Sequence, residues 1–150
     1  MFAPKKILVP TDFSVYADNA LKQAIDIAKQ NKAKIYLFHV IDDGFQQCAV
    51  DYCLDEGAVQ KILKDSMKNA KDKLQQEVKI ITDSHSSIEI VYDVRRGIPY
   101  EEILKEQEEK GIDLIVIASY GKTGILKNLL GGVVDKVVKR SKCQVLLVRN

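Results

Sequence analysis

The residues best suited to chemistry lie between Leu114 and Gly132, in the stretch LIVIASYGKTGILKNLLGG. Its first five residues are apolar enough to form a strand that is buried on both faces. Glycines follow at positions 121 and 124, and the pair Gly131–Gly132 precedes a second apolar run. Such a strand, glycine loop and helix start can cradle a phosphate, because backbone N–H groups and the positive end of the helix dipole favour an anion. The stretch therefore predicts an adenine-nucleotide site.

This stretch has two other interpretations besides a phosphate cradle. Glycines between a strand and a helix also occur wherever a tight turn needs a positive φ, so a purely structural role stays open. Gly121-Lys122-Thr123 looks like the end of a P-loop, but that motif needs a glycine five positions earlier, where Val116 stands. A P-loop is therefore excluded.

Apolar periodicity predicts strands and helices in alternation along the chain. Strands are predicted at residues 6–9, 34–40, 88–94, 114–118 and 144–148, and helices at residues 15–30, 59–78, 99–110 and 132–140. Residues 41–57 have no clear period and residues 82–87 are polar, so both segments are predicted to be loops. The alternation predicts one α/β domain over residues 1–150, with a Rossmann-like, doubly wound parallel sheet and helices on both faces.

The two most apolar strands, 6–9 and 114–118, are expected at the centre of the sheet, which implies the strand order 3-2-1-4-5. The winding then reverses between strands 1 and 4, and a ligand crevice is expected beyond their carboxyl ends. Thr11 and Asp12 would lie there opposite residues 119–121. This convergence of two polar loops supports the nucleotide hypothesis.

Composition excludes several classes of function. With 23 Lys and Arg against 21 Asp and Glu, the net charge of +2 gives no argument for nucleic acid as a partner. No apolar run reaches the roughly 18–20 residues of a membrane span, and the N-terminus has no leader-like apolar region. A cytoplasmic protein with no membrane partner is expected.

Cysteines and histidines give no strong signal for chemistry. Three cysteines form no disulfide framework, and Cys48 and Cys53 lack metal-ligand or redox spacing, so redox sensing is a distant alternative. His39 and His85 have no partner pattern that suggests catalysis.

Several short motifs together resemble the universal stress protein family over nearly the whole chain. They are Pro10-Thr11-Asp12-Phe13-Ser14, His39-Val40, Gly97-Ile98-Pro99 followed by acidic residues, and the closing strand that ends at Arg149. The resemblance implies a regulatory protein that binds ATP or another adenine nucleotide, with Mg²⁺ as a candidate companion, and that is not an enzyme beyond slow ATP hydrolysis. HIGH and SGGxDS-type motifs of adenylyl-transfer enzymes with this fold are absent.

Nucleotide-binding members of that family carry the pattern Gly-x2-Gly-x9-Gly-Ser/Thr, which aligns here with Ala118, Gly121, Gly131 and Gly132. Ala118 adds a methyl group, and Gly132 lacks the hydroxyl that would hydrogen-bond a phosphate. Val134 is also apolar where ATP-binding relatives often carry a hydroxyl. Each lost bond to a charged group is worth about 1.5–3 kcal/mol, so the two hydroxyls together predict binding weaker by roughly a hundredfold or more.

By resemblance, Asp12 and the backbone of Val40 would face the adenosine, and the glycine-loop residues would surround the ribose and phosphates. The predicted nucleotide-binding residues are Pro10, Thr11, Asp12, Val40, Ala118, Gly121, Gly131, Gly132 and Val133. Two structural roles stay open: Asp12, or alternatively Ser14, as the N-cap of the first helix, and Val40 as a core residue.

The resemblance also implies a homodimer formed by antiparallel pairing of the last strands, and an unidentified regulatory protein partner. Residues 145–148 are apolar and would otherwise leave an open sheet edge. Two functions are therefore expected. One is an ATP-binding regulatory protein; the alternative is a family member with a degenerate nucleotide site that acts as a dimeric protein-interaction module.

Overall fold

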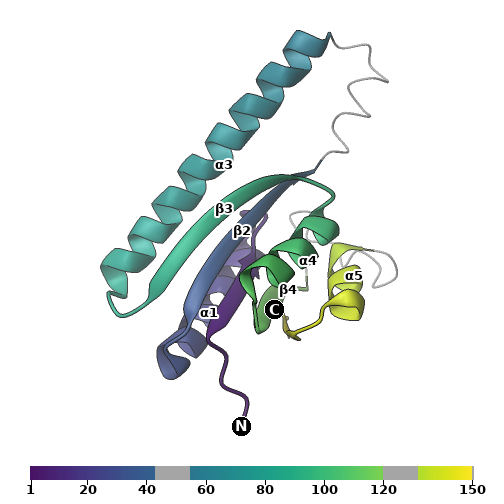
Figure 1. Cartoon of the computed structure of the whole chain (residues 1–150). Coiled ribbons are helices and arrows are strands. Elements are labelled where there is room, and N and C mark those ends of the chain that lie inside the picture. Colours follow the sequence, from purple (N-terminus) through teal and green to yellow (C-terminus); the bar gives the residue numbers. More distant parts are fainter. Residues whose placement is uncertain (43–54, 120–131, 150) are drawn as a thin grey trace.

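The fold was analysed in a computed structural model that describes residues 1–42, 55–119 and 132–149. Five parallel strands form one sheet in the order β3-β2-β1-β4-β5, which confirms the predicted order (Figure 1). The elements in chain order are β1 (Lys6–Pro10), α1 (Val15–Asn31), β2 (Lys34–Asp42), α3 (Glu56–Ser84), β3 (Glu89–Gly97), α4 (Pro99–Lys110), β4 (Leu114–Ala118), α5 (Val133–Arg140) and β5 (Gln144–Val148).

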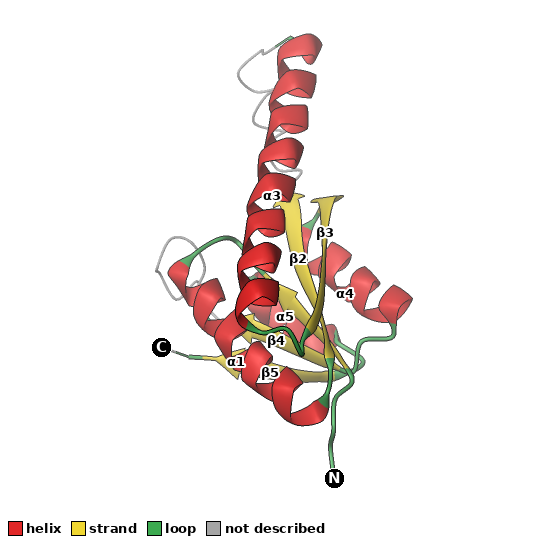
Figure 2. Ribbon diagram, turned by 90° about the vertical axis from the view of Figure 1, so that its left-hand side faces the viewer, coloured by secondary structure: helices red, strands yellow, loops and turns green. Residues whose placement is uncertain are grey.

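Helices cover both faces of the sheet, as the alternating pattern predicted (Figure 2). On one face, Ile7 and Val9 of β1 pack with apolar residues of α1 and α3. On the other, Leu8 packs with Ile103 of α4 and Val137 of α5. The central strands are buried on both sides for this reason, since each alternate residue faces a helical layer.

Strands β2 and β3 are longer than their apolar runs predicted. They pair over nine positions, and the register continues through Ile41 with Arg96 and Asp42 with Gly97. Residues 95–97 were expected to lie outside the strand because two arginines and a glycine end the apolar pattern. They remain in the ladder because β3 is an edge strand whose charged side chains reach solvent or carboxylates of α4.

Helix α3 is also longer than predicted. It spans 29 residues, begins behind the N-cap Asp55 and continues to Ser84, so the expected loop start at residue 82 was wrong. Asp55 accepts a hydrogen bond from the Ala58 N–H at 2.7 Å, and this satisfies a donor that the first turn would leave unpaired. Figure 1 shows α3 running well beyond the end of the sheet. Among the described residues, no helix is long and apolar enough to cross a membrane.

Candidate functional site

The carboxyl ends of the neighbouring strands β1 and β4 mark the point where the strand order reverses. Pro10 ends β1, and Thr11 and Asp12 follow it directly. Ala118 ends β4, and Ser119 follows. The structure therefore brings together the two segments that the sequence predicted to converge, at the position where parallel α/β sheets bind ligands.

The loop after β1 is held by its own polar side chains. The Thr11 N–H donates to the Phe38 carbonyl of β2 at 2.8 Å. The Phe13 N–H donates a hydrogen bond to Thr11 Oγ1, and the Ser14 N–H donates one to Asp12 Oδ1, each at 3.0 Å. These bonds fix a compact turn in place of further sheet.

The N-cap of α1 is Ser14, whose Oγ accepts the Ala17 N–H at 3.2 Å. Of the two N-caps that the sequence offered, Ser14 is therefore confirmed, and the carboxylate of Asp12 shapes the preceding turn instead. A carboxylate has about four lone-pair sites, so Asp12 can accept further hydrogen bonds while it holds Ser14.

Val40 lies on β2 beyond the end of β1. Its half-buried side chain packs against the core between the sheet and the α4–α5 layer, so the core role is confirmed. Backbone groups alternate between the two edges of a strand, and the Phe38 carbonyl faces β1. The N–H and C=O of Val40, two residues on, therefore face the same edge, where β1 has already left the ladder at Pro10.

The sequence showed no catalytic partner pattern for His39, and the structure places its ring against the loop that follows β1. Its Nδ1 lies 2.7 Å from the Thr11 carbonyl oxygen, and its ring centroid lies 4.6 Å from that of Phe13. Phe13 has φ of 64°, in the left-handed region that bulky residues rarely adopt. The sequence signals were a histidine near the end of a predicted strand and its place in the His39-Val40 motif.

At the end of β4, Ala118 is 8% exposed and belongs to the core under α1. The Ser119 N–H donates to the Val148 carbonyl at 2.9 Å and ties this point to β5. The Ser119 Oγ is buried, and within the described part of the chain it has no hydrogen-bond partner. A buried hydroxyl without a partner is uncommon and marks a place where a ligand group can bind.

Gly132 is the N-cap of α5, with φ of −80° and ψ of 173°. Any residue can adopt these angles, so the backbone does not require glycine here. The Gly132 carbonyl accepts the Lys136 N–H at 3.1 Å. Val133 begins the helix, and the first N–H groups of a helix have no partner within it, so they can bind an anion. Gly121, Gly131, Cys48 and Cys53 lie outside the described residues.

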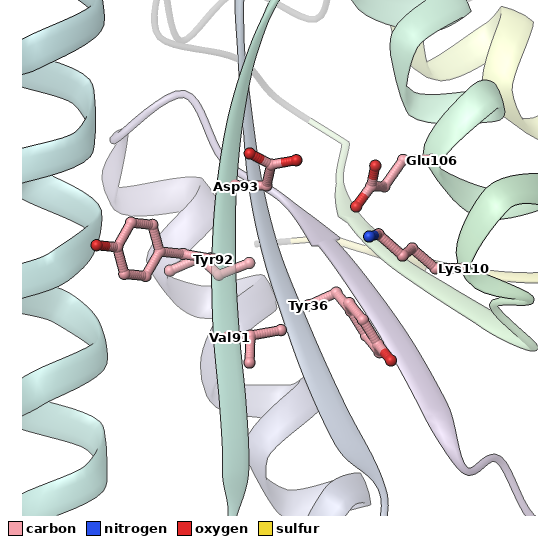
Figure 3. A pocket seen from close by; sticks show the side chains of 7 residues that line it. Tyr36, Val91, Tyr92, Asp93, Glu106 and Lys110 are labelled. Carbon is pink, nitrogen blue, oxygen red and sulfur yellow. The ribbon is translucent and has the colours of Figure 1, made fainter.

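A separate cavity of about 210 Å³ lies away from these loops, between β2, β3 and α4 (Figure 3). Tyr36, Asp93, Glu106 and Lys110 line it, and Glu106 is only 1% exposed. Burial raises the pKa of the Glu106 carboxyl, and Arg95 Nη2 lies 2.6 Å from its Oε2. This pairing joins α4 to the edge of the sheet.

Across the described ranges, no group of three or more His, Cys, Asp or Glu side chains could hold a metal ion.

Comparison with known proteins agrees with the fold. The model of the universal stress protein family matches residues 4–149. Universal stress protein MJ0577 of Methanocaldococcus jannaschii is 32% identical over 97% of this chain and 94% of its own. The structure of universal stress protein UspA from Lactobacillus plantarum has a TM-score of 0.81 at 26% identity, covering 97% of each chain.

The same fold occurs in the universal stress protein from Archaeoglobus fulgidus that was solved in complex with dAMP. Its TM-score is 0.64 at 19% identity, over 97% of this chain and 98% of that one. With a family match that runs almost from end to end and relatives that share its length, the chain belongs to the universal stress protein family.

Proposed function

We propose that this chain is a regulatory protein of the universal stress type that binds ATP or another adenine nucleotide, with at most slow hydrolysis. The observation that carries the proposal is the meeting of two polar segments, Thr11–Asp12 and Ser119, at the switch point of the sheet. The family member from Archaeoglobus fulgidus that was solved with dAMP shares this fold and supports an adenine nucleotide as the ligand class.

Each part of an adenine nucleotide has a suitable group in the proposed site. The N–H and C=O of Val40 face the open edge beyond β1, and a donor beside an acceptor suits the edge of an adenine ring. The carboxylate of Asp12 suits the ribose hydroxyls. The first turn of α5, from Val133, would supply N–H groups to the phosphates, where Mg²⁺ is a candidate companion.

A second function is favoured by one observation, the glycine at the N-cap of α5. The backbone angles of Gly132 would accept serine without strain, so the fold does not require glycine at this position. The chain therefore lacks a hydroxyl group that it could have carried there. A chain with this loss could retain the family fold and act as a dimeric protein-interaction module without tight nucleotide binding.

Calorimetric titration of the native chain with ATP and Mg²⁺, beside Gly132→Ser and Gly132→Ala, tests the two functions. We expect micromolar affinity for the native chain, and a gain of at least about tenfold for Gly132→Ser because one hydrogen bond to a charged phosphate is worth about 1.5–3 kcal/mol. Gly132→Ala is the matched control, since it adds a side chain without a hydroxyl and should show no gain.

Adenosine provides the second control. Serine is also a better N-cap than alanine, so it stabilises α5 whether or not a phosphate is bound. A gain that occurs with ATP and not with adenosine belongs to the phosphate contact. If only Gly132→Ser binds ATP, the interaction module is the better description. If neither chain binds any adenine nucleotide, the nucleotide function is wrong.

A further inference from the structure

The loop that follows β1 is supported from outside by the imidazole ring of His39 in β2. The Thr11 carbonyl oxygen lies 2.7 Å from His39 Nδ1. A carbonyl can only accept, so the hydrogen of this bond is on Nδ1. Thr11 is 8% exposed, which shields the bond from competition with water.

This bond fixes more than one atom, because the Thr11 carbonyl and the Asp12 N–H belong to the same planar peptide unit. Holding the oxygen toward His39 turns the Asp12 N–H to the opposite side. It also sets the direction in which the Asp12 backbone leaves that plane. The Asp12 side chain is then secured by its bond to the Ser14 N–H at 3.0 Å.

The His39 ring also supports the unusual backbone of Phe13. The two rings lie 4.6 Å apart at an interplanar angle of 43°. Lys73 Nζ of α3 lies 5.0 Å from the centre of the Phe13 ring, a cation–π distance. Phe13 has φ of 64°, and bulky residues stay in that region only where their surroundings hold them. The ring contacts supply that constraint.

We propose that His39 is a positioning residue of the nucleotide site: its Nδ1–H bond to the Thr11 carbonyl, together with its contact to Phe13, holds the Thr11–Asp12 peptide in the orientation that meets the adenosine. This inference rests on the proposed function. His39 does not touch the nucleotide in this arrangement. It acts through Thr11 and Asp12, on the side of the sheet that carries α1 and α3.

Two substitutions of His39 test separately its hydrogen-bond donor and its ring contact with Phe13. His39→Asn keeps an N–H donor at the same number of bonds from Cβ as Nδ1, and it removes the ring. His39→Phe keeps a ring beside Phe13 and removes the donor. His85→Phe, at the C-terminal end of α3, is the matched control for the same change of residue type away from the loop. Circular dichroism and thermal unfolding verify that each variant folds.

The first measurement needs no nucleotide. Nitrogen-15 shifts of the His39 ring should show hydrogen on Nδ1 at pH 8, and amide exchange should be followed at Asp12, Phe13 and Ser14. We expect exchange at these amides to be at least about tenfold faster in His39→Phe and within about threefold of native in His39→Asn and His85→Phe. A ring with hydrogen only on Nε2, or unchanged exchange in His39→Phe, would overturn the proposal.

The second measurement is calorimetric titration of the same chains with ATP and Mg²⁺. Affinity should fall by at least about tenfold in His39→Phe and stay within about threefold of native in His39→Asn, since one hydrogen bond is at issue. Equal losses in both variants would assign the effect to the ring and overturn the role of the donor. If the native chain binds no nucleotide, the proposed function fails, and the exchange measurement still decides whether His39 holds the loop.

Discussion

Arg95 is the residue with the densest set of ionic contacts on the edge strand. Its Nη2 lies 2.6 Å from Oε2 of both Glu106 and Glu109, and its other nitrogens lie 3.7 Å and 3.8 Å from Asp93 and Glu102. Three of these carboxylates come from α4, so one guanidinium joins the helix to β3. Arg95 lowers the pKa of the Glu109 carboxyl through a direct hydrogen bond.

Glu106 is the member of this group whose ionisation should be measurable as stability. Burial raises the pKa of its carboxyl above the usual value of 4.5. The folded state therefore holds the proton more tightly than the unfolded chain does. The stability that Glu106 contributes is fully present below pH 4.5 and is lost as the pH rises through the higher folded pKa.

Replacing Glu106 by glutamine tests this sign. The free energy of unfolding of the native chain should fall relative to that of Glu106→Gln as the pH rises from about 4 to 8, because only the native chain must bury a charge. Urea unfolding across this pH range measures the difference, with Glu101→Gln on the exposed first turn of α4 as the control. If the free energy of unfolding of the native chain instead rises relative to that of the variant as the pH rises, the Arg95 ion pair outweighs the cost of burying the charge.

At the scale of single residues, the sequence predicted features that depend on neighbouring residues, but it did not predict contacts between residues that are far apart in the sequence. Asp12 was singled out correctly as a loop residue, but its hydrogen bond to Ser14 required the turn to be seen. Glu102, Glu106 and Glu109 lie on one helical face by spacing alone. Their partner Arg95 depends on how α4 crosses β3, which no local pattern encodes.

At the scale of elements, the strand order could be predicted because burial on both faces makes Ile7–Val9 of β1 and the whole of β4 apolar. The lengths of β2, β3 and α3 could not be predicted well, because each continues into polar residues. Pairing with a neighbouring strand keeps Arg96 and Gly97 in the sheet, although neither has the composition of a strand. Tertiary contacts thus override local propensity at these ends.

The ends of two helices offer a matched test of backbone strain. Lys32 closes α1 with φ of 53°, and Gly111 closes α4 with φ of 63°. Only glycine adopts this region without cost, and other residues lose roughly 1 kcal/mol there. We expect Lys32→Gly to raise the free energy of unfolding by about 0.5–1 kcal/mol and Gly111→Ala to lower it by about 1 kcal/mol.

Chemical unfolding of both variants at neutral pH measures these changes. Lys32→Ala is the control, because it removes the lysine side chain and leaves the strain of a Cβ in the left-handed region. If Lys32→Ala stabilises the chain as much as Lys32→Gly, the gain comes from loss of the side chain and the backbone argument is wrong.

At the scale of the whole molecule, the sheet ends at β5, which has β4 as its neighbour on one side. Val145 and Leu147 pack toward the α4–α5 face, and Leu146 toward the α1–α3 face. An apolar strand at the end of a sheet is a template for pairing with another chain. This geometry supports the prediction of a homodimer in which two copies of β5 pair across a two-fold axis.

Proline substitutions in β5 test the dimer without shortening the strand. The bond from the Ser119 N–H to the Val148 carbonyl shows that Val148 faces β4, so by alternation Leu146 also faces β4 while Val145 and Leu147 face the open edge. Val145→Pro removes an N–H from that open edge only. We expect it to fold and to weaken dimerisation by at least about tenfold, since proline is tolerated at an edge but cannot donate to a new partner.

Leu146→Pro is the matched control, because it removes an N–H that faces β4. It should lower the free energy of unfolding by about 1–3 kcal/mol, through a lost bond inside the sheet. Light scattering at micromolar concentration then distinguishes the outcomes. A native monomer would contradict the predicted homodimer. A native dimer that persists in Val145→Pro would place the interface on another surface, whereas a folded monomeric Val145→Pro beside a dimeric native chain would locate the two-fold axis at β5.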